Sequence, residues 1–202
     1  TKIERFQKFV ASHSFTDRHF SYDNSSEKLL ALETLLKPYF ISLQSLSRIE
    51  CYDASNSALH DSTVSLTVMS NGLLDKGQYR RYKIKNPHAI SDFDRLDEAI
   101  IRRLKNTTWP KPDLIIIDGG VPQLRRLQRI FDRETNPPFY LGLAKHPDRL
   151  IVPNNNIGQP DFLTLKLSST HPALQLLEQL RDEAHRFANS YRKILEKKRT
   201  RI

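Results

Sequence analysis

Hydrophobic and polar residues recur with two different periods along this chain, and the change of period separates helices from strands. Leucines at helical spacing predict a first helix over residues 26–44, with Ser25 or Ser26 as its cap and Pro38 as its end or as a kink. From residue 48 onward the period becomes that of strands. Alternating residues joined by short turns predict an antiparallel meander of three strands, over residues 48–55, 63–69 and 78–85.

A second group of elements follows the meander. A helix over residues 91–105 starts at a good N-cap, Ser91, and the four apolar residues 114–117 predict a strand buried on both faces. Further helices and strands are expected over residues 121–131, 139–143, 150–152, 162–167 and from 170 onward. This order is the one expected of a ribonuclease H-like α/β fold, a mixed sheet with an antiparallel meander followed by βαβ units and flanked by helices, although other α/β layouts share it. We divide the chain into a helical N-terminal appendage, residues 1–45, and the α/β domain, residues 46–202, which ends in a basic tail.

Composition adds constraints on partners and compartment. The 202 residues include 32 lysines and arginines against 23 acidic residues, so the formal net charge is +9 and a polyanion such as DNA is a favoured partner. The single cysteine, Cys51, lies in an apolar run and is expected to be a small core residue. Because the chain has no membrane-length apolar stretch and no signal-peptide pattern, we expect a cytoplasmic protein with no membrane partner. The absence of an initiator Met indicates a piece of a longer chain.

Asp118 is the most informative single residue. It directly follows the buried strand and precedes Gly119 and Gly120, whose lack of side chains lets a ligand approach the backbone. Ligands of open α/β sheets bind outside the carboxyl ends of the strands, so a carboxylate there is a good metal ligand. The alternative is that Asp118 only caps the next helix. The loop has neither a Walker A nor a dinucleotide-binding pattern.

Three further residues are candidates with weaker local support. Asp53 ends the first strand as either a turn residue or a site residue; if that strand neighbours the Asp118 strand, the two carboxylates converge and suit Mg²⁺. Asp92 lies in the first turn of a helix, where the helix dipole alone favours an acidic residue. His185 lies beside the apolar stripe of the last helix, where a histidine is usually solvated or paired with a carboxylate.

Five segments, in the same order, resemble the C-terminal half of the bacterial UvrC excinuclease family. The match runs over about residues 48–198, and its last segment, RDEAHRF, is the most telling. The segments are residues 49–53 (IECYD), 79–82 (YRRY), 115–120 (IIIDGG), 142–145 (GLAK) and 181–187 (RDEAHRF).

This resemblance implies a ribonuclease H-like endonuclease domain of nucleotide excision repair, which hydrolyses a DNA phosphodiester on the 5′ side of a lesion. The family's catalytic Asp, Asp and His fall on Asp53, Asp118 and His185, which would ligate Mg²⁺ or Mn²⁺, and a further acidic residue linked to that incision falls on Asp92. His185 would ligate the metal or move a proton. The implied partners are DNA and a UvrB-type repair protein. The predicted DNA contacts are Arg80, Arg81, Lys145, Arg181 and Arg186.

Two loops depart from the family pattern. This chain has Ala54, Asn56 and Ser57 in place of the usual Ile, His and Thr after the first strand, and Val121 and Pro122 in place of Lys-Gly after the glycine pair. The second change removes a cation beside the site, which puts the efficiency of catalysis in doubt more than its mechanism.

Two alternative functions therefore stay open. One is a catalytically weakened DNA-binding or assembly module of the same family, and the other is a phosphate-recognising α/β domain of another class that uses the glycine turn. The chain also has no GIY-YIG nuclease segment, UvrB-binding segment or helix-hairpin-helix pair, so alone it is expected to bind DNA poorly.

Overall fold

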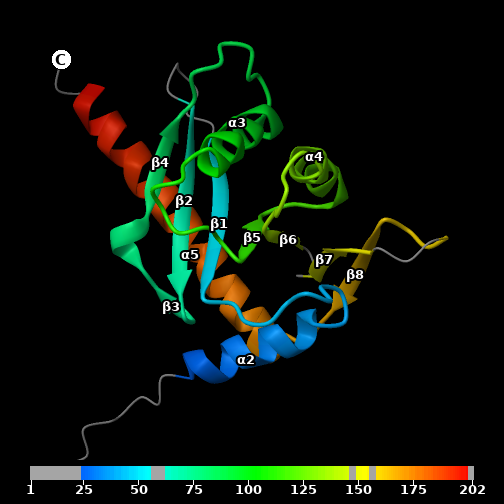
Figure 1. Ribbon diagram of the computed structural model, residues 1–202. Coiled ribbons are helices and arrows are strands. Elements are labelled where there is room, and N and C mark those ends of the chain that lie inside the picture. The colour runs from blue at the N-terminus through cyan, green and yellow to red at the C-terminus, as the bar shows by residue number, and fades with distance from the viewer. Residues whose placement is uncertain (1–23, 56–61, 146–148, 155–157, 200–202) are drawn as a thin grey trace, which may run out of the picture.

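An eight-stranded mixed sheet organises the computed structural model, which describes residues 24–55, 62–145, 149–154 and 158–199 (Figure 1). The strands are β1 (Arg48–Ser55), β2 (Thr63–Ser70), β3 (Leu73–Leu74), β4 (Arg80–Lys83), β5 (Leu114–Ile117), β6 (Phe139–Ala144), β7 (Arg149–Pro153) and β8 (Phe162–Lys166). The helices are α2 (Ser25–Leu36), α3 (Asp92–Leu104), α4 (Val121–Phe131) and α5 (Pro172–Arg199), with a 3₁₀ turn, η1 (Lys76–Gln78).

The strand order is β3-β2-β1-β5-β6-β7-β8, and β4 also pairs with β2. β1 pairs antiparallel with β2 and parallel with β5, which in turn pairs parallel with β6. The carboxyl ends of β1, β5 and β6 therefore lie together at one edge of the sheet. This topology confirms the predicted mixed sheet, in which an antiparallel meander precedes the βαβ units.

Helices cover both faces of the sheet and create two cores. α5, orange to red in Figure 1, crosses one face together with α2, whose Leu32 and Leu36 are buried in the same core as Ile49 and Cys51 of β1. α3 and α4 cover the other face, against Tyr52 and the neighbouring apolar residues of β2 and β5. Cys51 is buried as expected, and its burial raises the pKa of the thiol. No helix in the described ranges is long and apolar enough to span a membrane.

Several element ends differ from those expected. α2 ends at Leu36, before Pro38, and its N-cap position is Asn24, so neither Ser25 nor Ser26 caps it. The expected third strand is shorter, because the 3₁₀ turn comes first and β4 spans only Arg80–Lys83. The two-residue strand β3 carries no alternating pattern and was not expected. Residues 1–23, about half of the expected appendage, lie outside the described residues.

A buried ionic cluster lies between β1 and α3. The Glu50 carboxylate is fully buried and accepts hydrogen bonds from Arg48 Nε at 2.7 Å, Arg103 Nη2 at 2.9 Å and the Tyr52 hydroxyl at 2.8 Å. Arg103 comes from α3, so this cluster joins the helix to the central strand. Two buried cations that share one carboxylate make the loss of that carboxylate costly.

We predict that Glu50→Gln lowers the free energy of unfolding by about 3–5 kcal/mol, because two buried guanidinium groups lose their counter-ion. Urea denaturation measures this. The control is Asp161→Asn, since Asp161 forms an exposed ion pair with Arg125 at 3.6 Å, and there the loss should stay below about 1 kcal/mol. Equal losses in the two variants would contradict the structural role given to Glu50.

Candidate active site

Three parallel strands bring three charged residues to one edge of the sheet. Asp53 lies near the end of β1, Asp118 is the first residue after β5, and Lys145 is the first after β6. The register aligns these ends, because Tyr52 pairs with Ile117 in the β1–β5 ladder. The strands of Asp53 and Asp118 are therefore neighbours, as the convergence of the two carboxylates requires.

His185 reaches both carboxylates from α5. Its Nδ1 lies 3.0 Å from Asp53 Oδ2 and its Nε2 lies 3.0 Å from Asp118 Oδ2. α5 packs on the sheet face that carries Ile49 and Cys51, and Asp53 points to the same face because side chains alternate along a strand. One imidazole thus bridges two carboxylates from separate strands.

A second cation completes this group. Lys145 Nζ lies 2.9 Å from Asp118 Oδ2 and 3.0 Å from His185 Nε2. Hydrogen bonds with Asp118 and Asp53 raise the pKa of His185 to about 9, against the opposing effects of burial and Lys145. Burial raises the pKa of Asp118, but hydrogen bonds from His185 and Lys145 outweigh it and the pKa is lowered. With its pKa raised in this way, His185 carries a positive charge at neutral pH.

Close packing around the turn after Asp118 explains why glycine is needed at two positions. A Cβ on Gly142 of β6 would lie 2.4 Å from the carbonyl oxygen of Gly119, and one on Gly119 would lie 2.6 Å from Cδ of Gln123. The N-cap position of α4 is Gly120, whose N–H donates to Gln123 Oε1 at 3.0 Å. Asp118 is therefore not the cap, and its carboxylate is directed to His185 and Lys145 instead.

A cavity of about 260 Å³ opens beside these residues, and Asp92 faces it from the first turn of α3. The Asp92 carboxylate also accepts a hydrogen bond from Arg95 Nη1 at 2.7 Å. Three carboxylates, on β1, α3 and the end of β5, thus share one cavity. Its lining consists of Tyr52, Asp53, Ala54, Asp92, Phe93, Leu96, Ile117, Asp118 and Gln123.

The carboxylates of Asp53, Asp92 and Asp118 match what a hard divalent cation such as Mg²⁺ or Mn²⁺ binds, whereas an imidazole nitrogen suits softer divalent metals better. Within the described ranges, however, no three His, Cys, Asp or Glu side chains are already gathered as a metal site. Both nitrogens of His185 are engaged with carboxylates. The carboxylates at the site are of a residue type that fits a divalent cation.

The five predicted DNA contacts lie in different surroundings. Lys145 is at the site, and the Arg81 guanidinium stacks on Phe187, with its carbon 3.7 Å from the ring centroid. Arg80 lies on the opposite face of β4, over the Trp109 ring. The remaining two are on α5: Arg181 is buried beside Asp182, and Arg186 is exposed and paired with Glu183.

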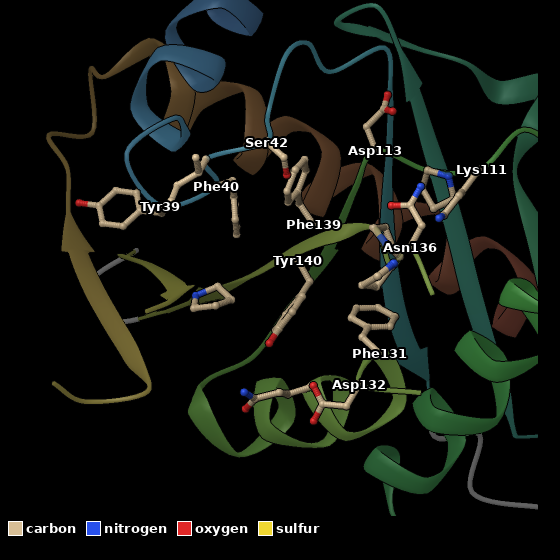
Figure 2. A pocket seen from close by; sticks show the side chains of 16 residues that line it. Tyr39, Phe40, Ser42, Lys111, Asp113, Phe131, Asp132, Asn136, Phe139 and Tyr140 are labelled. Atoms are coloured by element: carbon tan, nitrogen blue, oxygen red, sulfur yellow. The ribbon is translucent and has the colours of Figure 1, made fainter. Parts of the chain in front are cut away.

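A larger cavity, of about 730 Å³, lies at the amino ends of β5 and β6, away from these residues (Figure 2). Aromatic side chains line it, including Phe131, Phe139 and Tyr140. Two carboxylates, Asp113 and Asp132, also line it, and Asp113 accepts hydrogen bonds from Ser47 and from the backbone N–H of Arg48, which joins these two segments of the chain. This cavity contains none of the residues that the sequence singled out.

Two residues of the site were missed by reasoning from the sequence. Gln123 closes the turn and faces the cavity, and Gly142 makes room for the Gly119 carbonyl. A glutamine three residues after an N-cap is a recognisable capping signal and could have indicated Gln123. Gly142 had no such signal, because its neighbour comes from a distant segment.

Comparison with known proteins gives a consistent result. The profile described as the UvrC RNAse H endonuclease domain matches residues 40–189. UvrABC system protein C of Dictyoglomus thermophilum is 42% identical over 179 residues, which are 86% of this chain and 28% of that protein. The protein of the same name from Prosthecochloris aestuarii is 36% identical over 173 residues, 84% of this chain and 27% of its own length. The chain therefore spans just over a quarter of these relatives.

A solved structure of Ciona intestinalis endonuclease V in complex with DNA also matches. The match covers 70% of this chain and 58% of the endonuclease V chain, at 15% identity and a TM-score of 0.36. Likeness at this level is too slight to support a conclusion about fold or function.

We predict that His185 titrates near pH 9 in the metal-free chain, which NMR of its ring protons measures. Because the folded pKa lies above the ordinary value of 6.5, the stabilisation from His185 is complete below pH 6.5 and is lost as the pH rises through 9. Relative to His185→Gln, the free energy of unfolding should fall over that range. A titration midpoint near pH 6.5 would mean that Asp53 and Asp118 do not stabilise the protonated ring of His185.

Proposed function

This chain belongs to the UvrC RNase H endonuclease domain family, and from that premise we propose that it is a metal-dependent DNA endonuclease domain. It hydrolyses one phosphodiester on the 5′ side of a lesion in nucleotide excision repair. The observation that carries the proposal is the chain of contacts Asp53–His185–Asp118 at the carboxyl ends of parallel strands, next to a cavity lined by carboxylates.

Asp53 and Asp118 are the proposed ligands of Mg²⁺ or Mn²⁺, with His185 as a third and Asp92 facing the same cavity. A bound ion of this kind supplies Lewis acidity and lowers the pKa of a water molecule. The protein positions these ligands: β1, the end of β5 and α5 hold them, and the two buried cores lie on either face of the sheet.

His185 and Lys145 are the proposed groups that handle protons and charge. A ring nitrogen that binds the metal cannot also carry a proton, so His185 acts as the third ligand or moves a proton at Nε2, which lies beside Asp118 Oδ2 and Lys145 Nζ. Lys145 carries a positive charge beside Asp118 and can contact a phosphate oxygen. Val121 stands in place of the usual family lysine, and Lys145 supplies a lysine charge next to Asp118.

Arg81 is the proposed contact to the DNA backbone beyond the cut. Asp53 pairs with Ser65 across the β1–β2 ladder, and Ser65 pairs with Arg81 across the β2–β4 ladder. Arg81 is thus in the same row as Asp53, two strands away, or about 10 Å. Its guanidinium stacks on Phe187 and contacts the Ser190 hydroxyl at 3.2 Å, which favours a fixed cation near the site.

The proposed partners follow from the family. The relatives are named UvrABC system protein C, so we propose that the full-length protein acts on DNA together with a UvrB-type protein. The net charge of +9 supports a DNA partner.

A second candidate function is a catalytically weakened DNA-binding or assembly module of the same family. One observation favours it: Val121 and Pro122 replace the lysine and glycine of the family loop. The two functions differ in whether the chain binds a divalent cation at Asp53 and Asp118 and cuts DNA.

We predict that the chain nicks supercoiled plasmid in the presence of Mn²⁺ and that Asp118→Asn reduces the rate at least about 100-fold, because a ligand and the partner of His185 are lost together. Asp132→Asn, at an exposed carboxylate that follows the last residue of α4, serves as the control and should keep the rate. Equal nicking rates in the wild type and Asp118→Asn would mean that Asp118 is not a metal ligand on which hydrolysis depends.

We also predict saturable binding of Mn²⁺ or Mg²⁺ in isothermal titration calorimetry, lost in Asp53→Asn and Asp118→Asn and kept in Asp132→Asn. Carboxylates that share one cavity lose most of their affinity when one becomes an amide. An absence of saturable binding in the wild type would favour the weakened module instead.

A further inference from the structure

The side-chain amide of Gln123 has a fixed orientation. The backbone N–H of Gly120 must find an acceptor, and it donates to Gln123 Oε1 at 3.0 Å. The oxygen of the amide therefore faces the turn, and the NH₂ group is at the other end. Gln123 Nε2 lies over Gly119, only 2.9 Å from where a Cβ would be, so the side chain folds back across the glycine that follows Asp118.

Gln123 is one of the residues that line the cavity shared by Asp53, Asp92 and Asp118. Within the described residues Nε2 donates to no protein acceptor, although its Oε1 is used. The other side-chain donor in the lining, the hydroxyl of Tyr52, is bonded to Glu50 in the buried ionic cluster. Gln123 thus offers the cavity an uncommitted N–H donor among three carboxylates.

A donor in that place is of little use to a metal ion, which needs electron pairs, but it suits an anionic oxygen. Phosphate groups are bound by neutral amides as well as by cations. We propose that Gln123 Nε2 donates a hydrogen bond to a non-bridging oxygen of the phosphate that is cut, while Gln123 Oε1 keeps the turn closed. This inference rests on the proposed endonuclease function and adds a substrate contact to it.

The competing explanation is that Gln123 only caps α4. Glutamate at the third helical position caps a helix start as well as glutamine does, because its carboxylate also accepts the hydrogen bond from the N-cap N–H. Gln123→Glu therefore separates the two roles: it keeps the acceptor for Gly120 and removes the NH₂ donor. Gln123→Ala removes both.

The experiment measures three quantities for each variant of the whole 202-residue chain: the thermal unfolding midpoint, Mn²⁺ binding by calorimetry, and the nicking rate with Mn²⁺ at saturating plasmid. Pro122→Glu is the control for a charge added at the start of α4, since this exposed residue is in the same helical turn and does not line the cavity. We expect Gln123→Glu to keep the midpoint, to bind Mn²⁺ at least as tightly as the wild type, and to lose about 10- to 100-fold in rate. Pro122→Glu should keep all three quantities.

Two results would overturn the role of Gln123 while leaving the endonuclease function intact: a Gln123→Glu variant that nicks as fast as the wild type, or a Pro122→Glu variant that loses as much rate as Gln123→Glu. A wild-type chain that binds Mn²⁺ and plasmid without nicking would contradict the endonuclease function, and the phosphate contact with it. A lower thermal unfolding midpoint in Gln123→Ala, together with an unchanged rate and midpoint in Gln123→Glu, would mean that Gln123 only caps α4.

Discussion

The candidate site depends on one interaction, the bridge that His185 makes between the carboxylates of Asp53 and Asp118. Parallel pairing of β1 with β5 brings the carboxylates to the same edge of the sheet, and α5 supplies the cation between them. Two partly buried carboxylates without a cation would disfavour each other's ionised form. The same three residues therefore satisfy a requirement of the fold and, in the proposed function, present ligands to a metal ion.

Close backbone packing supports that bridge. Gly142 leaves room for the carbonyl oxygen of Gly119, and Gln123 folds over Gly119 and accepts the N–H of Gly120. Asp118 is the residue immediately before this turn, so its position is set by backbone contacts as well as by its own hydrogen bonds. In this chain the two residues after Gly120, Val121 and Pro122, differ from those of the family. The turn is nevertheless closed, with Gly120 at the N-cap position of α4.

The sequence predicted much of the fold but only part of the site, for physical reasons. Asp118 stood out because a buried strand, a carboxylate and a glycine turn are adjacent in the chain. His185 had no local signal, since its partner Asp53 is 132 residues away, and only the family resemblance singled it out. The orientation of Gln123 required the turn itself to be seen. Element ends were less predictable where short-range turns, such as η1, replaced an expected strand.

The most direct measurement of the central claim is the broadening of histidine ring resonances by substoichiometric Mn²⁺, since a paramagnetic ion acts on nearby nuclei. His185 should broaden first, while His171, which immediately precedes α5 and is about 21 Å away by helical rise, should stay sharp. Asp53→Asn or Asp118→Asn should abolish the effect. If both histidines broaden alike, or if His185 broadens equally without these carboxylates, Asp53, Asp118 and His185 do not form one metal-binding site.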